Sequence, residues 1–223
     1  MQVLIKMSQL IFKFPFKANY FEEDFYVSSN NFEAYRLIES WPNWISRNIN
    51  IFGEKGCGKT HLANILQEKI NSIIVKAADI NEKSLSLIKV KECLVIEDYK
   101  NNIDEKLMYS ILNECQQSNK YVIVNSNNPI KKLPIKLNDL KSRLDGFLDI
   151  GIDLPTDDLI RVILTKVFSD KQIKTDIKLL EYILKNINRS YVEIFSFINK
   201  VDSLSLSTGK SININLIKKA LSI

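Results

Sequence analysis

A phosphate-loop motif, G-x-x-x-x-G-K-[ST], is complete at residues 53–60, which read GEKGCGKT. Its glycines allow the backbone to curl so that N–H groups point at the oxygens of a bound phosphate. Lys59 can reach the β and γ phosphates of a nucleotide, and the hydroxyl of Thr60 can ligate the accompanying Mg²⁺. We therefore predict nucleotide-binding residues at Gly53, Gly56, Gly58, Lys59 and Thr60.

The residues around this motif have the pattern that a phosphate loop requires. The apolar stretch Ile49–Phe52 precedes it and indicates a strand, and the helical pattern Lys59–Ile70 follows it. A helix that begins there directs the positive end of its dipole at the phosphates. A glycine-rich turn alone would be weak evidence, because many strand-to-helix turns need glycine. The complete motif in this setting favours nucleotide binding.

Two carboxylates end the next strongly apolar stretch, Cys93–Asp98. In a phosphate-loop site, one carboxylate completes the Mg²⁺ shell and the next orients or deprotonates the attacking water. Glu97 is our candidate for the metal and Asp98 for the water, whereas ATPases of this type usually place Asp first. Because an ångström of misplacement can cost about a hundredfold in rate, we expect binding to survive this order and hydrolysis to be less certain. An acidic cap after a strand is the alternative interpretation.

Two further polar positions could contribute to phosphate chemistry. The apolar run Tyr121–Val124 leads into Asn125, whose amide could sense a γ-phosphate or a water, although Asn/Ser clusters are also common in turns. Arg143 follows in the segment DLKSRL, and its five donors could neutralise charge on the nucleotide of a neighbouring subunit. A solvated charge at a helix end is the alternative for Arg143.

Strand-like and helical patterns alternate from the motif to Ile152. They predict the α/β fold class, with a parallel five-stranded sheet covered by helices and ligands at the carboxyl ends of the strands. From Pro155 onward only helical patterns follow, which predicts a small all-helical lid domain. We therefore expect an N-terminal segment, a nucleotide-binding domain and a lid, at residues 1–20, 21–154 and 155–223.

The composition fits a globular protein and argues against several other classes. A chain of 223 residues can bury one α/β core and a small helical domain, and no apolar run reaches membrane-spanning length. The three cysteines have neither disulfide-like nor zinc-ligand spacing. A net charge of +5 permits contact with nucleic acid, but the basic residues are scattered. Because the first residues lack the features of a signal peptide, we expect a cytoplasmic location.

Taken together, the motifs resemble the AAA+ module of the Hda/DnaA-like family of replication proteins. The resemblance is carried by Phe25–Val27 with Asn31 and Ala34, then GEKGCGKTHL, LVIED, NSNNP, DLKSRL and the helical lid after Pro155. It implies a P-loop AAA+ module that binds ADP or ATP with Mg²⁺ held through Thr60 and Glu97. Carried over residue by residue, it implies further nucleotide contacts from Val27, Asn31 and His61.

Two features favour the Hda-like branch of this family over the initiators. The chain ends at Ile223, just after the lid, and we expect no helix-turn-helix domain of the kind with which initiators read origin DNA. The segment QLIFKF resembles the clamp-binding peptide of Hda and implies contacts with the sliding clamp from Gln9, Leu10, Phe12 and Phe14. A plain edge strand is the alternative interpretation of this segment.

The lid departs from the family pattern at one position. Its third helix should carry a sensor arginine, but alignment of the segment SYVEI places Val192 there. Arg189 lies three residues earlier, about one helical turn away, and is our candidate for the lid contact with nucleotide. Ser190 and Glu193 form a capping box, however, which would leave Arg189 just outside the helix.

The resemblance implies a regulator of chromosomal replication initiation. Such a protein would bind adenine nucleotide and attach to the DNA polymerase sliding clamp (β subunit), and so indirectly to DNA. It would present Arg143 to ATP-bound DnaA and promote hydrolysis of that ATP. Its own ATPase activity would be weak at most, it could form a homo-oligomer, and no membrane partner is expected. The alternatives are an ATP-driven helicase loader and an origin-associated accessory factor of the DnaA type.

Overall fold

The computed structural model describes residues 22–170, 176–208 and 212–221. These residues form two compact units, which meet in the sequence between Leu154 and Pro155. The predicted clamp-binding residues Gln9, Leu10, Phe12 and Phe14 lie outside the described residues.

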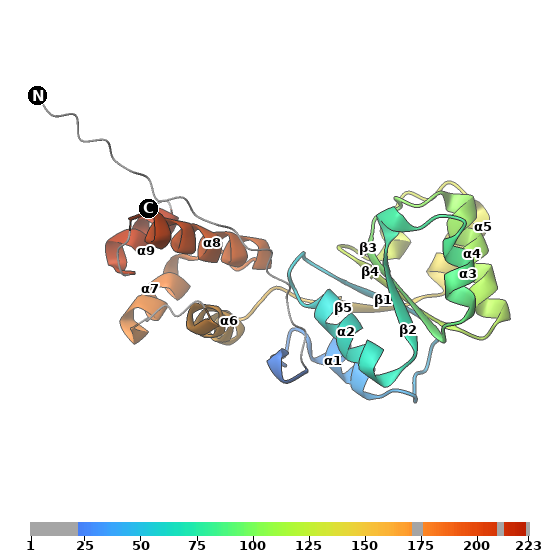
Figure 1. Ribbon diagram of the computed structural model, residues 1–223, viewed down its shortest axis with the longest axis horizontal. Helices are drawn as coiled ribbons and strands as arrows, with labels where there is room; N and C mark the ends of the chain where they lie inside the picture. The colour runs from blue at the N-terminus through green and yellow to red at the C-terminus, as the bar shows by residue number, and fades with distance from the viewer. Residues whose placement is uncertain (1–21, 171–175, 209–211, 222–223) are drawn as a thin grey trace, which may run out of the picture. The chain divides into compact units, whose positions relative to one another are not determined.

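The described part of the first unit holds a sheet and the helices that connect its strands (Figure 1). Its strands are β1 (Asn48–Gly53), β2 (Ser72–Lys76), β3 (Cys93–Tyr99), β4 (Tyr121–Ser126) and β5 (Leu148–Ile152). Its α-helices are α1 (Phe32–Glu39), α2 (Lys59–Lys69), α3 (Ser84–Lys89), α4 (Glu105–Gln117) and α5 (Asn138–Asp145). Short 3-10 helices occur at η1 (Glu22–Asp24), η2 (Ala77–Asp79) and η3 (Ile130–Lys132).

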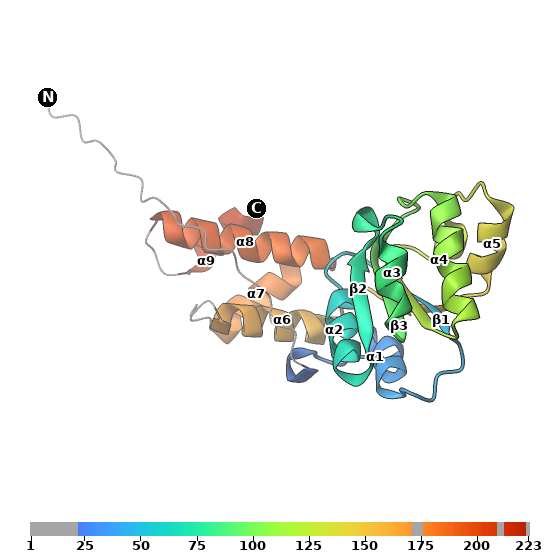
Figure 2. The same ribbon diagram turned by 45° about the vertical axis from the view of Figure 1, so that its right-hand side comes forward.

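The sheet has the order β2-β3-β4-β1-β5, and every neighbouring pair is parallel. β1 lies between β4 and β5, so the loop that follows β1 leaves the sheet beside two other strand ends. Figures 1 and 2 show α1 and α2 on one face of the sheet and α3, α4 and α5 on the other. Because all neighbouring strands are parallel, their carboxyl ends lie together along one side of the sheet, here called the carboxyl edge.

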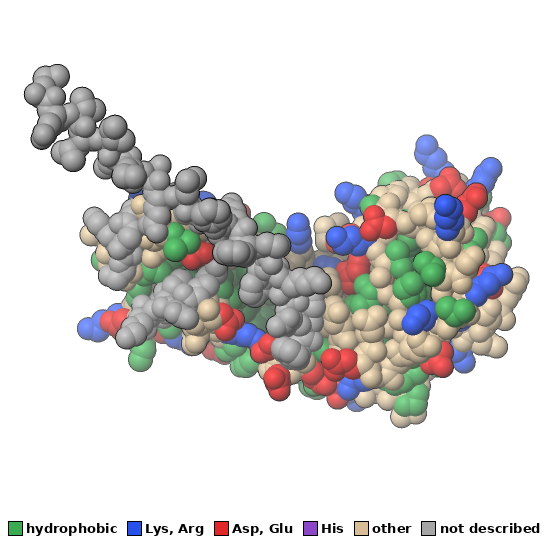
Figure 3. Space-filling view, viewed as in Figure 1, with side chains coloured by type: hydrophobic (Ala, Val, Ile, Leu, Met, Phe, Trp, Pro, Cys, Tyr) green, Lys and Arg blue, Asp and Glu red, His purple; other side chains and the backbone are tan. Residues whose placement is uncertain are grey.

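The strands are apolar along most of their length because both faces of the sheet are covered. Leu94 and Ile96 of β3 pack into a buried cluster with Met108 and Ile111 of α4. Val95 points to the opposite face and is also fully buried. On the face shown in Figure 3, Lys and Arg side chains of this unit are interspersed with acidic and hydrophobic ones, in keeping with their scatter along the sequence.

Helices form the second unit, which has its own hydrophobic core. They are α6 (Asp157–Asp170), α7 (Ile177–Asn186), α8 (Tyr191–Thr208) and α9 (Ile214–Leu221). In α7, Leu180, Ile183 and Leu184 follow the three-and-four spacing of a helix that buries one face. Asp176 caps α7 by accepting from the N–H of Lys178, and Asn213 caps α9 by accepting from the N–H of Leu216.

The predicted fold class, a parallel five-stranded sheet followed by helices, is confirmed. Helices α1 and α3 were not predicted, although the buried Ala34, Leu37 and Ile38 of α1 have helical spacing. β3 extends past the predicted stretch Cys93–Asp98 to Tyr99, and β4 extends past the predicted run Tyr121–Val124 to Ser126, so that Asn125 lies within its strand and not after it. Among the described residues, no helix is long and apolar enough to cross a membrane.

Candidate nucleotide-binding site

The phosphate loop connects β1 to α2, as its motif predicted. Gly56 and Gly58 have φ values of 92° and 102°, in the left-handed region that side chains disfavour. A Cβ atom at Gly53 would lie 2.7 Å from the carbonyl oxygen of Ile152, and one at Gly58 would lie 2.9 Å from the ring of Phe25. The loop therefore needs glycine at these positions, both for its curl and for its close packing.

Lys59, the motif lysine, is buried, and its ammonium group lies inside the curl of the loop. Its Nζ donates to the carbonyl oxygens of Gly53, at 2.6 Å, and Glu54, at 3.1 Å. These two hydrogen bonds keep the ammonium group at the loop, where it can donate to the oxygens of a bound phosphate. Burial raises the pKa of the neighbouring Cys57 thiol despite the attraction of Lys59, which favours Cys57 as a small packing residue.

Three predicted site residues meet at the carboxyl edge of the sheet. The hydroxyl of Thr60 donates to Oε2 of Glu97 at 3.1 Å, and Nδ2 of Asn125 donates to Oε1 of Glu97 at 2.8 Å. Burial is the main cause that raises the pKa of Glu97, and the charge of Asp98 adds to it. The site thus combines Lys59 and Thr60 of α2 with the carboxylate of Glu97 from β3 and the amide of Asn125 from β4.

The oxygen atoms of this site suit a hydrated Mg²⁺ ion. A carboxylate and a hydroxyl, from Glu97 and Thr60, lie next to the phosphate loop, and Mg²⁺ prefers such ligands together with water and phosphate oxygens. Oδ1 of Asn125 is buried and has no hydrogen-bond partner among the described residues. It could accept from a metal-bound or attacking water, which fits the predicted sensor role.

Asp98, the second predicted carboxylate, lies differently from Glu97. It has a positive φ of 57°, and the pairing of β3 with β4 shifts register between Ile96 and Tyr99. This irregularity keeps both Glu97 and Tyr99 buried while the side chain of Asp98 is exposed. Asp98 can therefore reach solvent at this edge, and its role with water stays a prediction.

The segment before α1 packs against the phosphate loop through Phe25. The ring of Phe25 lies 5.2 Å from His61 in an edge-to-face contact and stacks 5.7 Å from Tyr35. Asn31 is buried, accepts from the N–H of Ser28 at 2.8 Å and donates to the carbonyl of Tyr26 at 2.9 Å. The Asn31 amide therefore holds the turn that carries Val27.

Sequence reasoning missed Asn50, a fully buried amide in the middle of β1. Its Nδ2 donates to the carbonyl of Val124 and to Oγ of Ser126, both at 2.8 Å, and its Oδ1 accepts from the N–H of Ile130 at 3.0 Å. Asn50 thus fixes the end of β4 on both sides of Asn125. The signal was present, because a polar residue interrupts the apolar run from Ile49 to Phe52.

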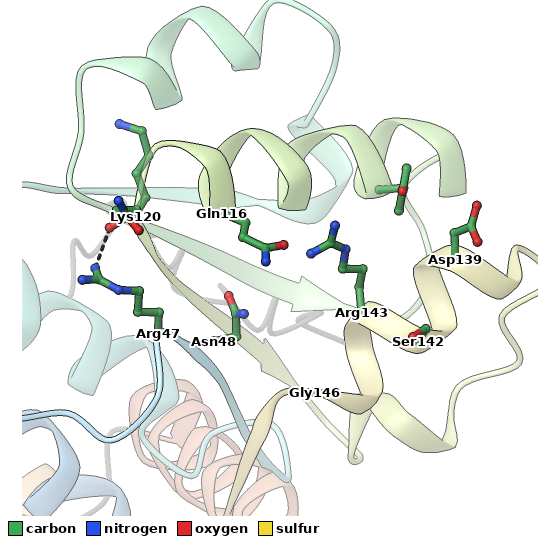
Figure 4. Close-up of a pocket in the computed structure, with 10 residues that line it drawn as sticks. Arg47, Asn48, Gln116, Lys120, Asp139, Ser142, Arg143 and Gly146 are labelled. Carbon is green, nitrogen blue, oxygen red and sulfur yellow. Dashed lines mark hydrogen bonds between the residues drawn. The ribbon is translucent and has the colours of Figure 1, made fainter.

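Arg143 lies near the amino ends of the strands, whereas the phosphate loop lies at their carboxyl ends. It belongs to α5 and lines a cavity of about 710 Å³ with Arg47 and Asn48, at the amino end of β1 (Figure 4). The phosphate loop begins at the other end of the same strand, roughly 16 Å away at strand rise. That separation exceeds the reach of one arginine side chain, so Arg143 does not belong to the nucleotide site of its own chain.

Arg189 lies in the helical unit and pairs with a carboxylate there. Its Nε donates to Oδ1 of Asp157 at 2.9 Å, and its Nη2 donates to Oδ2 at 3.2 Å. α8 begins at Tyr191, and Oγ of Ser190 accepts from the N–H of Glu193 at 3.4 Å. Arg189 therefore precedes the helix, and its predicted contact with nucleotide stays a prediction.

Comparisons of the sequence with known proteins give a match to one family model and matches to replication initiator proteins. Residues 49–135 match a family model described as RNA helicase. The chain is 27% identical to the chromosomal replication initiator protein DnaA of Buchnera aphidicola, over 97% of this chain and 53% of that protein. It is 26% identical to DnaA of Nautilia profundicola, over 89% and 51%. The chain therefore spans about half the length of the curated relatives it matches.

Solved structures with the same fold include further DnaA proteins. Domain III of the Thermotoga maritima replication initiation protein DnaA matches with a TM-score of 0.74 and 18% identity, over 94% of this chain and 98% of that one. AMPPCP-bound DnaA from Aquifex aeolicus matches with a TM-score of 0.66 and 21% identity, over 84% and 66%. Together with the sequence matches, these confirm the predicted Hda/DnaA-like AAA+ resemblance.

We expect Lys59→Ala to remove most of the nucleotide-dependent rise in melting temperature. A ligand at a hundred times its Kd stabilises the native state by about 2.7 kcal/mol, or roughly 5 to 10 °C for a protein of this size. Thermal unfolding with and without ADP and Mg²⁺ measures the shift. Lys55→Ala removes an exposed lysine from the same loop and should keep it. An equal shift in Lys59→Ala would remove Lys59 from the site.

We expect Glu97→Gln to raise the melting temperature of the nucleotide-free protein by a few degrees at pH 8. The raised pKa of Glu97 means that folding disfavours the charged carboxylate, a cost that is full above the raised pKa and absent below its ordinary value of 4.5. The gain over the parent should therefore shrink as the pH falls toward 4.5. If the gain in melting temperature of Glu97→Gln grew as the pH fell, the pKa of Glu97 would not be raised and the prediction would be wrong.

Proposed function

We propose that this DnaA-like AAA+ protein regulates the initiation of chromosomal replication. In this proposal it binds adenine nucleotide with Mg²⁺, attaches to the sliding clamp, and promotes hydrolysis of the ATP bound to DnaA. The observation that carries the proposal is the position of Arg143 at the sheet edge opposite its own phosphate loop.

That position suits an arginine that acts on the nucleotide of another subunit. In P-loop NTPases an arginine supplied from a neighbouring protein neutralises charge that develops on the γ-phosphate. Arg143 is half-buried in α5, and its Cζ lies 5.9 Å from the ring of Tyr109. The aromatic ring limits the motion of the guanidinium group without occupying its hydrogen-bond donors. The donors remain available to phosphate oxygens on a partner.

The chain's own site supports binding of ADP or ATP more strongly than fast hydrolysis. Lys59 would contact the phosphates, and Thr60 and Glu97 would hold Mg²⁺, which would supply charge neutralisation at the phosphates. Glu97 is a longer side chain than the usual Asp at the metal position, and Asp98 is a shorter one than the usual Glu at the water position. We therefore propose weak ATPase activity for this chain alone, as its resemblance to Hda-like proteins implies.

An ATP-driven helicase loader is the second candidate function. It is favoured by the assembled contacts among Thr60, Glu97 and Asn125, which are the groups that turnover in this chain would need. An origin-associated accessory factor shares the same fold. Retention on the clamp that depends on Gln9 distinguishes the regulator from the loader, and salt-sensitive DNA binding without the clamp distinguishes it from the accessory factor.

We expect Arg143→Ala to abolish the stimulation of ATP hydrolysis on DnaA. An arginine supplied in trans is worth about 10³ to 10⁵ in rate for P-loop NTPases in general, so the loss should be large. The measurement is single-turnover hydrolysis of ATP pre-bound to DnaA, with clamp-loaded DNA. Arg143→Lys should rescue little because a point charge does not reproduce the planar fork of arginine.

Lys141→Ala is the matched control, since it removes an exposed positive charge from the same helix, α5. It should stimulate DnaA like the parent, and Arg143→Ala should retain binding of its own nucleotide. If Arg143→Ala stimulated DnaA as strongly as the parent does, the trans-arginine mechanism would be wrong.

We expect the double variant Gln9→Ala, Leu10→Ala to lose retention on the sliding clamp and to keep its affinity for nucleotide. The expected motif lies outside the nucleotide-binding domain, so its effects should be nearly additive with those of changes at Lys59. Pull-down with clamp-loaded DNA measures retention, and the ADP-dependent melting shift measures nucleotide binding. Clamp retention equal to that of the parent would sink the assignment of Gln9 and Leu10.

A further inference from the structure

The cavity that contains Arg143 holds a second arginine, Arg47, just before β1. Figure 4 shows the two guanidinium groups on opposite sides of the cavity, with the side-chain amides of Asn48 and Gln116 between them. Arginine occurs only five times in this chain, at positions 36, 47, 143, 161 and 189. Two of the five therefore line one cavity.

Arg47 is held in place by the backbone and by aromatic rings. One nitrogen, Nη1, donates to the carbonyl oxygen of Asn119, and Cζ lies 4.6 Å from the ring of Tyr121. That ring is itself packed edge-to-face against Trp41, at 4.7 Å, and Trp44, at 5.4 Å. A guanidinium group stacked on a fixed ring keeps its other nitrogens available as planar donors.

The remaining charges around the cavity favour an anion. The third cation, Lys120, directs its Nζ at the carbonyl oxygens of Lys89 and Lys91. Asp139 is the one carboxylate among the residues that line the described cavity, and Figure 4 shows it on the far side of Arg143 from Arg47. The space between the two arginines is therefore lined by donors and neutral amides.

We propose that Arg47 and Arg143 form one phosphate-binding pocket, in which Arg47 is a second arginine that contacts the phosphates of a nucleotide held by a partner AAA+ subunit. This inference rests on the proposed role of Arg143 in trans. Two guanidinium groups that line one cavity offer more donors to the several oxygens of a triphosphate than one does. Arg47 then determines how tightly the partner's phosphates are held, together with Arg143.

The first test compares Arg47→Ala with Arg143→Ala in single-turnover hydrolysis of ATP pre-bound to DnaA, on clamp-loaded DNA. Loss of charge-assisted hydrogen bonds should lower the stimulated rate by roughly ten- to a hundredfold in Arg47→Ala. Arg36→Ala removes an exposed arginine from α1, outside the cavity, and should leave the rate unchanged. Arg47→Lys, which keeps the charge but not the fork, should recover only part of the rate.

The second test measures phosphate binding directly and without a partner. Pyrophosphate is titrated into the Lys59→Ala variant, whose own phosphate loop is disabled, and amide and arginine side-chain NMR signals are followed. Signals of the cavity should shift with pyrophosphate, and Arg47→Ala should weaken this binding at least several-fold. Native NMR dispersion and melting temperature of Arg47→Ala separate loss of the site from loss of the fold.

The outcomes distinguish this inference from the function on which it rests. If Arg143→Ala lowers the stimulated rate but folded Arg47→Ala does not, and pyrophosphate binding is unchanged by Arg47→Ala, the two-arginine pocket is wrong and the single trans arginine stands. If neither variant changes the stimulated rate, the proposed function fails together with this inference. A rate lowered equally by the Arg36→Ala control would assign the effect to net charge and overturn the role of Arg47.

Discussion

The parallel direction of all five strands is the constraint on which the chemistry of this protein depends. Because every strand points the same way, the carboxyl ends of all strands lie along one side of the sheet, the carboxyl edge. The amino ends lie along the opposite side, the amino edge. The carboxyl edge brings together the phosphate loop after β1 and the polar ends of β3 and β4. The amino edge brings together the beginning of β1, the beginning of β4 and the end of α5. One sheet thus separates the groups that we propose to hold a nucleotide from an arginine that could act on the nucleotide of another subunit.

At the carboxyl edge, the buried carboxylate of Glu97 organises the site, and its burial costs free energy of folding. Glu97 is only 5% exposed, and its raised pKa indicates that the hydrogen bonds from Thr60 and Asn125 do not fully compensate its burial. A divalent cation would place further positive charge beside this carboxylate. Asn50 contributes from β1, which lies next to β4. Its three hydrogen bonds hold the chain around Asn125 in place. The side chains that would bind a divalent cation therefore also affect the stability of the fold.

Sequence reasoning found most features that depend on local pattern, with α1 and α3 as exceptions, and missed those that depend on tertiary contacts. The phosphate loop, the strands and the lid helices follow from spacing, capping and apolar periodicity. The exposure of Asp98 depends on a register shift between β3 and β4, which the sequence of either strand does not specify. The pairing of Arg189 with Asp157, 32 residues away, and the meeting of Arg47 with Arg143, 96 positions apart in the numbering, likewise require the folded chain.

Helix α4 connects the loop that carries α5 with the cavity around Arg143. At its start, the carboxylate of Glu105 accepts from the N–H groups of Lys136 and Leu137, just before α5. The hydrogen bond from the Asn101 amide, together with these two, lowers the pKa of Glu105. Tyr109, one turn later, contacts Arg143, and Gln116, two turns further, lines the cavity. One face of α4 therefore fixes the approach to α5, supports its arginine and completes the cavity. The orientation of Arg143 thus depends on a helix packed on the same sheet that carries the phosphate loop.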